Sequence, residues 1–203
     1  MKLIKYSVLF LLFSVALMVQ AASSPEKMLQ ESADKIISVL KSNQSKLKSN
    51  PTLIYSAVQQ YLLPNVDVSG MSRSVLGRDA WMKATAAEKQ AFSQAFTKLV
   101  IRTYAGPLSK YNGETVRFHP VRGGVQGRFV RVDSDIIRPA GPAIPLSYSL
   151  VSKSGQWKVY DLSVEGISLL QSFHAQFAQV LERSSLADLT AQMEHQQLKK
   201  VAS

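Results

Sequence analysis

The chain has 203 residues, no cysteine and a formal net charge of +10. Without cysteine the chain has no disulfides, no thiol catalysis and no cysteine metal site, so its core must be held together by packing. The basic balance favours acidic partners, such as anionic lipid headgroups, acidic protein patches or nucleic acid, or it simply keeps an exported protein soluble.

A signal peptide is predicted over residues 1–21. Lys2 and Lys5 precede an uncharged apolar run from Tyr6 to Val19, and Val19-Gln-Ala21 fits a small-x-small cleavage site. An uncleaved membrane anchor is the alternative, but about 18–20 apolar residues are needed to span a bilayer and this run is shorter. No cysteine follows the run, so the leader does not have the pattern of a lipoprotein.

The remaining residues, 22–203, are expected to form one domain that begins at Ala22. This length is enough for a single hydrophobic core. A disulfide-free exported protein of this size fits the bacterial periplasm better than a eukaryotic secretory route. We therefore expect a periplasmic protein of a Gram-negative bacterium.

The first half of this domain carries apolar residues at helical spacing. Asn50-Pro51 and Pro64 separate two helices, Gly77 ends a third, and Thr85-x-x-Glu88 is a capping box that begins a fourth. The expected helices cover residues 25–47, a segment from Pro51 to Pro64, a short segment with Met71, Val75 and Leu76, and a segment from Thr85 to about Tyr104, where Gly106-Pro107 interrupts it.

The apolar period then changes from 3.6 to 2, which predicts strands. They lie around Val116 and Phe118, from Phe129 to Ile137, from Ile144 to Leu150, and from Trp157 to Val164 after a Ser154-Gly155 turn. Two further helices are expected, from Ile167 to Leu181 and from Ser185 to Met193. The order predicts an α+β fold, in which a curved antiparallel sheet of about four strands packs against several helices, as in an NTF2-like or cystatin-like core with helical additions.

The residue types of common catalytic sites are present but do not form a known pattern. His119, His174 and His195 are far apart in sequence, and Asp133 and Asp135 share one face of a strand in a pattern typical of a solvated surface. No nucleophile elbow, Walker loop or dinucleotide-binding glycine motif occurs. Because the histidines are far apart and cysteine is absent, no metal is expected, and because the lysines and arginines are dispersed, no nucleic-acid partner is expected.

Asp161 is the one acidic residue among apolar neighbours, between Tyr160 and Leu162 in the last long strand. It could act as a catalytic base in a conical pocket, as in the NTF2-like isomerases. The interpretation we favour is structural, because a buried carboxylate needs hydrogen bonds from backbone amides or from a nearby Arg or Tyr.

Four stretches together carry a family resemblance: Asn50-Pro51, the segment from Leu62 to Asp67, the helix from Thr85 to Phe96, and the pattern Trp157…Tyr160-Asp161…Glu165-Gly166-Ile167-Ser168. In this order they resemble the MlaC family, also called the toluene-tolerance Ttg proteins. Each motif is short, but the likeness extends over nearly all of residues 25–199.

The resemblance implies a periplasmic phospholipid carrier with no catalytic activity and no cofactor, whose fold encloses an apolar pocket for acyl chains. Its cargo would be phospholipid. Its partners would be the MlaA–porin complex at the outer membrane and MlaD of the MlaFEDB transporter at the inner membrane, and its role would be to maintain outer-membrane lipid asymmetry.

Physical chemistry is consistent with such a carrier. Two acyl tails with about 30 methylenes gain on the order of 25 kcal/mol on leaving water, so an aqueous carrier needs a deep apolar cavity. The residues expected to line it are Phe96, Val100, Tyr104, Phe118, Val130, Val132, Leu146, Tyr148, Leu150, Leu162, Ile167 and Leu170. The same residues could form a filled core, in which case the alternatives are an NTF2-like enzyme that uses Asp161 and a ligand-free periplasmic adaptor or chaperone.

Overall fold

The computed structural model describes residues 24–195; the predicted signal peptide, residues 1–21, lies outside this range. The described helices, in chain order, are α1 (Pro25–Ser42), the 3-10 turn η1 (Gln44–Lys46), α2 (Thr52–Ala57), the π-helical turn η2 (Val58–Leu62), the 3-10 turn η3 (Leu63–Asn65), α3 (Val68–Leu76), α4 (Arg78–Lys83), α5 (Ala86–Leu108), α6 (Leu169–Leu181) and α7 (Leu186–Glu194). The strands are β1 (Thr115–Phe118), β2 (Phe129–Ile137), β3 (Ile144–Lys153), β4 (Gln156–Val164) and β5 (Ile167–Ser168).

The five described strands form one antiparallel sheet in the order β1-β2-β3-β4-β5, which confirms the predicted α+β fold. Two-residue turns join β3 to β4 and β4 to β5. Ser154 and Gly155 have φ of 50° and 75°, and Glu165 and Gly166 have φ of 51° and 84°. Positive φ at both central residues is what a type I′ turn requires, and this turn matches the twist of adjacent strands.

The structure differs from the sequence prediction at three helix boundaries. The first helix ends at Ser42 because the Asn43 side chain donates a 2.8 Å hydrogen bond to Val39 O, which caps the helix before residue 47. Gly106-Pro107 does not interrupt α5, since Ser109 N donates to Ala105 O over 2.8 Å and closes a final turn around the proline.

The third difference concerns Ile167, which was predicted to begin a helix. Ile167 instead pairs with Val164 in the short strand β5, and α6 begins at Leu169 with Ser168 as its N-cap. The helix α4 was not predicted at all, because its six residues are too few for a helical period to be recognised.

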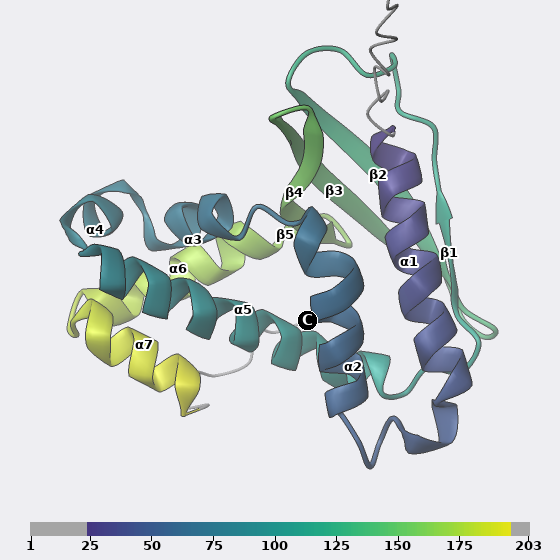
Figure 1. Cartoon of the computed structure of the whole chain (residues 1–203), viewed down its shortest axis with the longest axis horizontal. Coiled ribbons are helices and arrows are strands. Elements are labelled where there is room, and N and C mark those ends of the chain that lie inside the picture. The colour runs from purple at the N-terminus through teal and green to yellow at the C-terminus, as the bar shows by residue number, and fades with distance from the viewer. Residues whose placement is uncertain (1–23, 196–203) are drawn as a thin grey trace, which may run out of the picture.

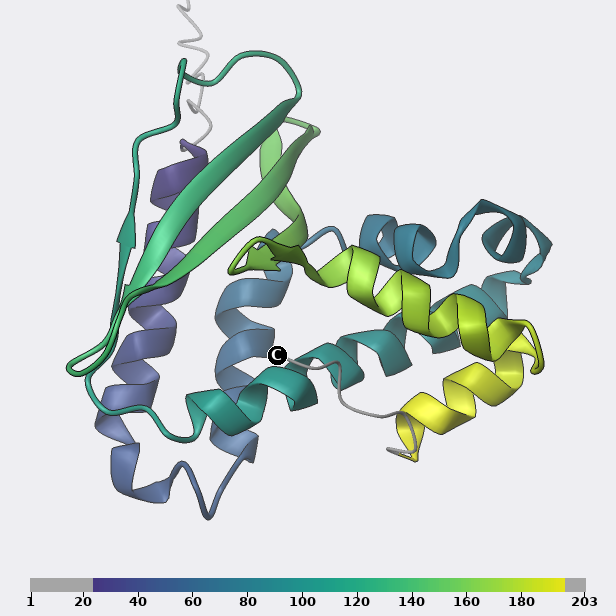
Figure 2. The ribbon, with the colours of Figure 1, turned by 180° about the vertical axis from the view of Figure 1, so that it is seen from behind.

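Two parts of the molecule diverge from a shared middle (Figure 1). In one part α1 packs against the sheet. In the other, α3, α5, α6 and α7 form a helical bundle with α4 at its far end, and Figure 2 shows the same arrangement from behind. The helix α2 stands between the two parts, beside the C-terminal half of α5.

The buried apolar side chains form three clusters instead of one. A bundle cluster joins α3, α5, α6 and α7 and contains Phe92, Phe96, Phe173 and Phe177, whose rings lie 5.3–6.2 Å apart. A hinge cluster joins the end of α1, the connection that follows η1, α2, η2 and the end of α5. A sheet cluster joins α1 to β2, β3 and β4. The members of the hinge cluster are Leu40, Leu47, Ile54, Val58, Ile101 and Ala105, and those of the sheet cluster are Met28, Leu29, Val132, Leu150 and Val159.

Candidate functional site

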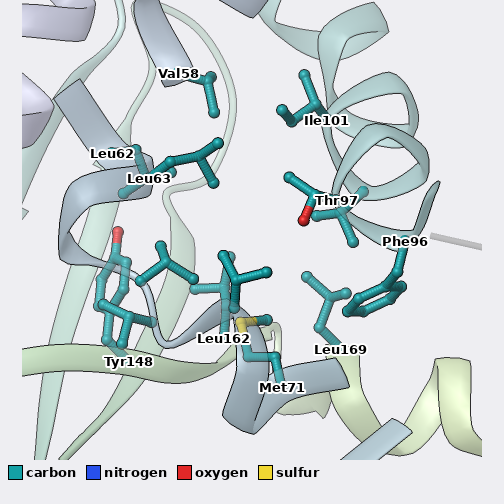
Figure 3. A pocket seen from close by; sticks show the side chains of 14 residues that line it. Val58, Leu62, Leu63, Met71, Phe96, Thr97, Ile101, Tyr148, Leu162 and Leu169 are labelled. Carbon is teal, nitrogen blue, oxygen red and sulfur yellow. The ribbon is translucent and has the colours of Figure 1, made fainter. Parts of the chain in front are cut away.

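An apolar cavity of about 110 Å³ lies where the three clusters meet. One wall comes from η2 and η3, the opposite wall from α5, and the floor from α3, β3, β4 and the start of α6 (Figure 3). Its lining residues are Val58, Leu62, Leu63, Val66, Val68, Met71, Phe96, Thr97, Val100, Ile101, Tyr148, Val159, Leu162 and Leu169. The cavity is therefore a gap in the middle of the core, bounded by all three clusters.

The lining contains no charged residue, and only Thr97 and Tyr148 bring a polar side-chain atom. The Thr97 hydroxyl donates a 2.8 Å hydrogen bond to Ser93 O within α5, so it needs no hydrogen-bond acceptor from a ligand. The Tyr148 ring packs 5.7 Å from that of Phe118. Burial raises the pKa of the Tyr148 phenol above its usual range, an effect that the Ser134 hydroxyl partly offsets. The cavity therefore presents an uncharged, apolar surface.

The segment after η2 is fixed to the sheet by backbone and side-chain bonds. Val66 forms a parallel bridge to Val159, and Asp67 N donates to Val159 O over 2.8 Å. The Asp67 carboxylate accepts a 3.0 Å bond from Gly70 N, which caps α3, and pairs with Lys153 Nζ at 2.5 Å. The Leu62–Asp67 motif therefore positions three lining residues (Leu62, Leu63 and Val66) against β4.

Asp161 accepts hydrogen bonds from backbone amides, as the favoured interpretation of this residue expects. Its Oδ1 accepts hydrogen bonds from Leu162 N at 2.8 Å and from Leu170 N at 3.2 Å, and its Oδ2 accepts one from Ser168 Oγ at 2.7 Å. The carboxylate thus ties β4 to the beginning of α6. Leu162 and Leu169, on either side of this bond network, both line the cavity.

Four of the twelve residues expected at the pocket line this cavity: Phe96, Val100, Tyr148 and Leu162. Val132 and Leu150 are fully buried in the sheet cluster, and Phe118 and Val130 pack against it. Leu170 and Tyr104 belong to the bundle cluster and its edge. Leu146 is half-buried on β3 opposite Ser134 and Val164, and Ile167 is 59% exposed.

The other lining residues were not predicted from the sequence. Val58 and Leu62 lie in the helix predicted between Pro51 and Pro64, and Ile101 in the one predicted from Thr85, but apolar residues at helical spacing give the same signal for a filled core as for a cavity wall. Val66, Val68 and Val159 are brought together by a parallel bridge between distant segments, for which short-range periodicity carries no signal.

The remaining titratable residues do not form a second site within residues 24–195. No group of three or more His, Asp or Glu side chains there could hold a metal ion, and no helix in that range is long and apolar enough to cross a membrane. Asp133 and Asp135 lie on β2, paired with Arg131 at 3.2 Å and with His119 at 2.9 Å. Hydrogen bonds from the Ser147 hydroxyl and Arg131 hold the pKa of Asp133 below its usual range.

These features define a small α+β protein in which helices and a sheet surround a neutral apolar cavity. The profile of the family described as MlaC protein matches residues 30–195. The chain belongs to the MlaC family.

Similar proteins come from several Gram-negative bacteria. Toluene tolerance protein ttg2D of Pseudomonas putida is 29% identical over 90% of this chain and 84% of its own length. The intermembrane phospholipid transport system binding protein MlaC of Haemophilus influenzae is 30% identical over 86% of this chain and 82% of its own length. A solved phospholipid-binding protein from Ralstonia solanacearum, in complex with a phospholipid, is 26% identical with a TM-score of 0.76, and the match covers 83% of this chain and 94% of that one.

Proposed function

We propose that this protein binds one phospholipid with its acyl chains in the central cavity and carries it through the periplasm. The observation that carries the proposal is the cavity lining, which has no charged residue and lies at the junction of three separate apolar clusters. The solved relative with a phospholipid bound supports the identity of the ligand.

The cavity must widen to accept a lipid. Its volume of about 110 Å³ is below the roughly 300–1,000 Å³ of ordinary small-molecule pockets. Widening separates η2 from α5, so it loosens the hinge cluster, to which Val58 and Ile101 both belong, and the acyl chains would have to replace those contacts. The acyl chains would then complete the core, and the approximate 0.8 kcal/mol per buried methylene would favour the widened state.

The two alternatives from the sequence fit the geometry less well. Both Asp161 oxygens already accept hydrogen bonds, and Asp161 is absent from the cavity lining, which leaves no carboxylate there to act as the base of an NTF2-like reaction. A ligand-free adaptor would have no use for a neutral cavity in its centre.

Within the family role, we propose that the protein is exported by residues 1–21 and moves lipid between the MlaA–porin complex and MlaD of the MlaFEDB transporter.

The test is organic extraction of the protein purified from the periplasm, followed by mass spectrometry and phosphate analysis. About one phospholipid per folded protein is expected. Protein that carries none, and that takes up none from vesicles labelled with a fluorescent phospholipid, would refute lipid carriage. Lipid transfer between vesicles that carry the purified MlaA–porin and MlaFEDB complexes tests the partners separately.

A further inference from the structure

Positive charge gathers at one end of the molecule, away from the cavity. Residues 35–66 contain four lysines and no Asp or Glu, and residues 89–113 contain three lysines and one arginine and again no acid. Figures 1 and 2 both place the end of α1, the beginning of α2 and the end of α5 together at this end. The end of the first stretch, with Lys46 and Lys48, and the end of the second, with Arg102 and Lys110, therefore become one surface, whereas Lys89 lies at the other end of α5 over the Trp81 ring.

A groove of about 610 Å³ runs along this surface between the α1–α2 connection and the C-terminal half of α5. Lys48 and Arg102 line it, together with Thr52, Tyr55 and Thr103. Lys46 lies two residues before Lys48, and Lys110 directly follows Ser109, another lining residue. We refer to Lys46, Lys48, Arg102 and Lys110 as the basic rim of this groove.

The basic rim has no acidic partner within the described chain. The four ion pairs among residues 24–195 involve Arg117, His119, Arg131 and Lys153, and none involves a rim residue. Arg102 donates one hydrogen bond to Met193 O at the end of α7, which spends one of its five N–H groups. The rim lysines are exposed, so their charge is available to a partner.

Packing and hydrogen bonds hold the walls of the groove in place. Specific recognition of a partner is therefore favoured over the non-specific attraction of a flexible charged surface. Leu47, between two rim lysines, is fully buried in the hinge cluster. Gln44 Nε2 donates to Tyr111 O over 3.2 Å and ties the α1–α2 connection to the segment after α5. A rigid concave site with several cations suits an extended acidic chain, whereas a flat membrane surface cannot enter it.

We infer that this groove docks an acidic polypeptide segment of a partner protein. The inference rests on the proposed function, since a lipid carrier must dock at its donor and acceptor, and it assigns this task to a surface distinct from the cavity. The chain's own residues 196–203 are a poorer occupant, because they carry Lys199 and Lys200 and no Asp or Glu. A second copy would bring the same positive surface to the contact.

The probe is a fluorescein-labelled peptide of alternating Glu and Ser, compared with the same peptide in which Gln replaces Glu. The full-length mature protein should bind the Glu peptide at least tenfold more tightly, and salt should weaken the binding. The double variant Lys48→Glu/Lys110→Glu should weaken it at least tenfold. The matched control Lys83→Glu/Arg183→Glu makes the same change in net charge at exposed sites on the bundle, and should weaken it less than threefold. Zero-length carbodiimide coupling should attach the peptide to Lys46, Lys48 or Lys110.

Four results would overturn the inference. The two double variants could weaken binding equally, or the coupled lysines could be spread over the surface, which would indicate a general polyanion effect. Binding to vesicles that contain phosphatidylglycerol could depend on the basic rim while binding of the peptide does not, which would indicate a membrane site. Removal of residues 196–203 could raise peptide affinity tenfold, which would indicate that the chain's own end occupies the groove. Phospholipid per protein, measured on the same samples, reports the proposed function independently and should be the same in the rim variant and in wild type.

Discussion

A pair of identical substitutions distinguishes the cavity from the filled core. Val100 is partly buried on α5 and lines the cavity, whereas Val132 is fully buried on β2 in the sheet cluster. In Val100→Trp the new ring replaces an isopropyl group at the wall of a cavity of about 110 Å³, so it can fill empty space instead of displacing packed side chains, although this space is smaller than the cavity of about 150 Å³ that holds a benzene ring. In Val132→Trp the ring has no such space, and overpacking of a filled core costs about 1–3 kcal/mol or more.

The expected results differ for stability and for lipid. For a domain of this size 1 kcal/mol corresponds to about 2–4 °C, so Val132→Trp should melt about 2–12 °C lower, or fail to fold, and Val100→Trp within about 2 °C of wild type. If the ring excludes about three methylenes of lipid, the affinity falls by about 2.4 kcal/mol, or about fiftyfold. Differential scanning fluorimetry on delipidated protein and phospholipid titration measure the two effects. A Val100→Trp variant that melts as low as Val132→Trp, or that keeps its full lipid affinity, would refute the assignment of this cavity.

Substitutions at three further positions test individual contacts. Asp161→Ala should lower the free energy of unfolding by about 2–3 kcal/mol in urea titrations, because three donors lose their acceptor. Asp161→Asn should lower it by about 1 kcal/mol, because the amide keeps one oxygen for the backbone donors and loses the acceptor of the Ser168 hydroxyl. Equal stability of Asp161→Ala and wild type would contradict the structural role. Gly70→Ala should lower the free energy of unfolding by about 0.5–2 kcal/mol, since a Cβ there would lie 2.1 Å from Asp67 Oδ2 and displace the cap of α3. The control Ser69→Ala, at the exposed neighbouring residue, should change it by no more than about 0.5 kcal/mol. Burial raises the pKa of Tyr148 in the folded state, so the unfolded state releases the phenol proton first and the free energy of unfolding should fall as pH rises above about 10. Tyr148→Phe should make this loss of stability with pH less steep. An unchanged dependence of stability on pH in Tyr148→Phe would count against a buried neutral phenol.

The fold was largely predictable because its elements carry local signals. Alternation over Phe129–Ile137 and the Ser154-Gly155 turn predict strand and hairpin directly, and the capping box at Thr85 marks where α5 begins. Boundaries set by a single side chain were not predictable. Asn43 ends α1 with one hydrogen bond, and nothing in the apolar pattern up to residue 47 announces it.

The cavity was less predictable for a physical reason. The periodicity of apolar residues along the sequence is the same whether their side chains contact other side chains or line an empty space. The sequence therefore does not distinguish Val132, which lies in a filled core, from Val100, which lines a cavity. The distinction arises from how three clusters meet, which depends on long-range contacts such as the Val66–Val159 bridge. Family resemblance supplied the expectation of a pocket, and the arrangement of the helices determines which residues surround it.

The two long walls of the cavity differ in how firmly they are held. The α5 wall belongs to a helix of 23 residues with a capping box, whereas the opposite wall is the five-residue π-helical turn η2 followed by a three-residue 3-10 turn. Short irregular turns of this kind open locally at lower free energy than long packed helices. Amide hydrogens of Val58–Leu62 should therefore exchange with solvent sooner than those in the middle of α5. The residence time of a bound molecule would then follow the local stability of this one turn, and a substitution that stabilises the whole fold elsewhere would leave it unchanged.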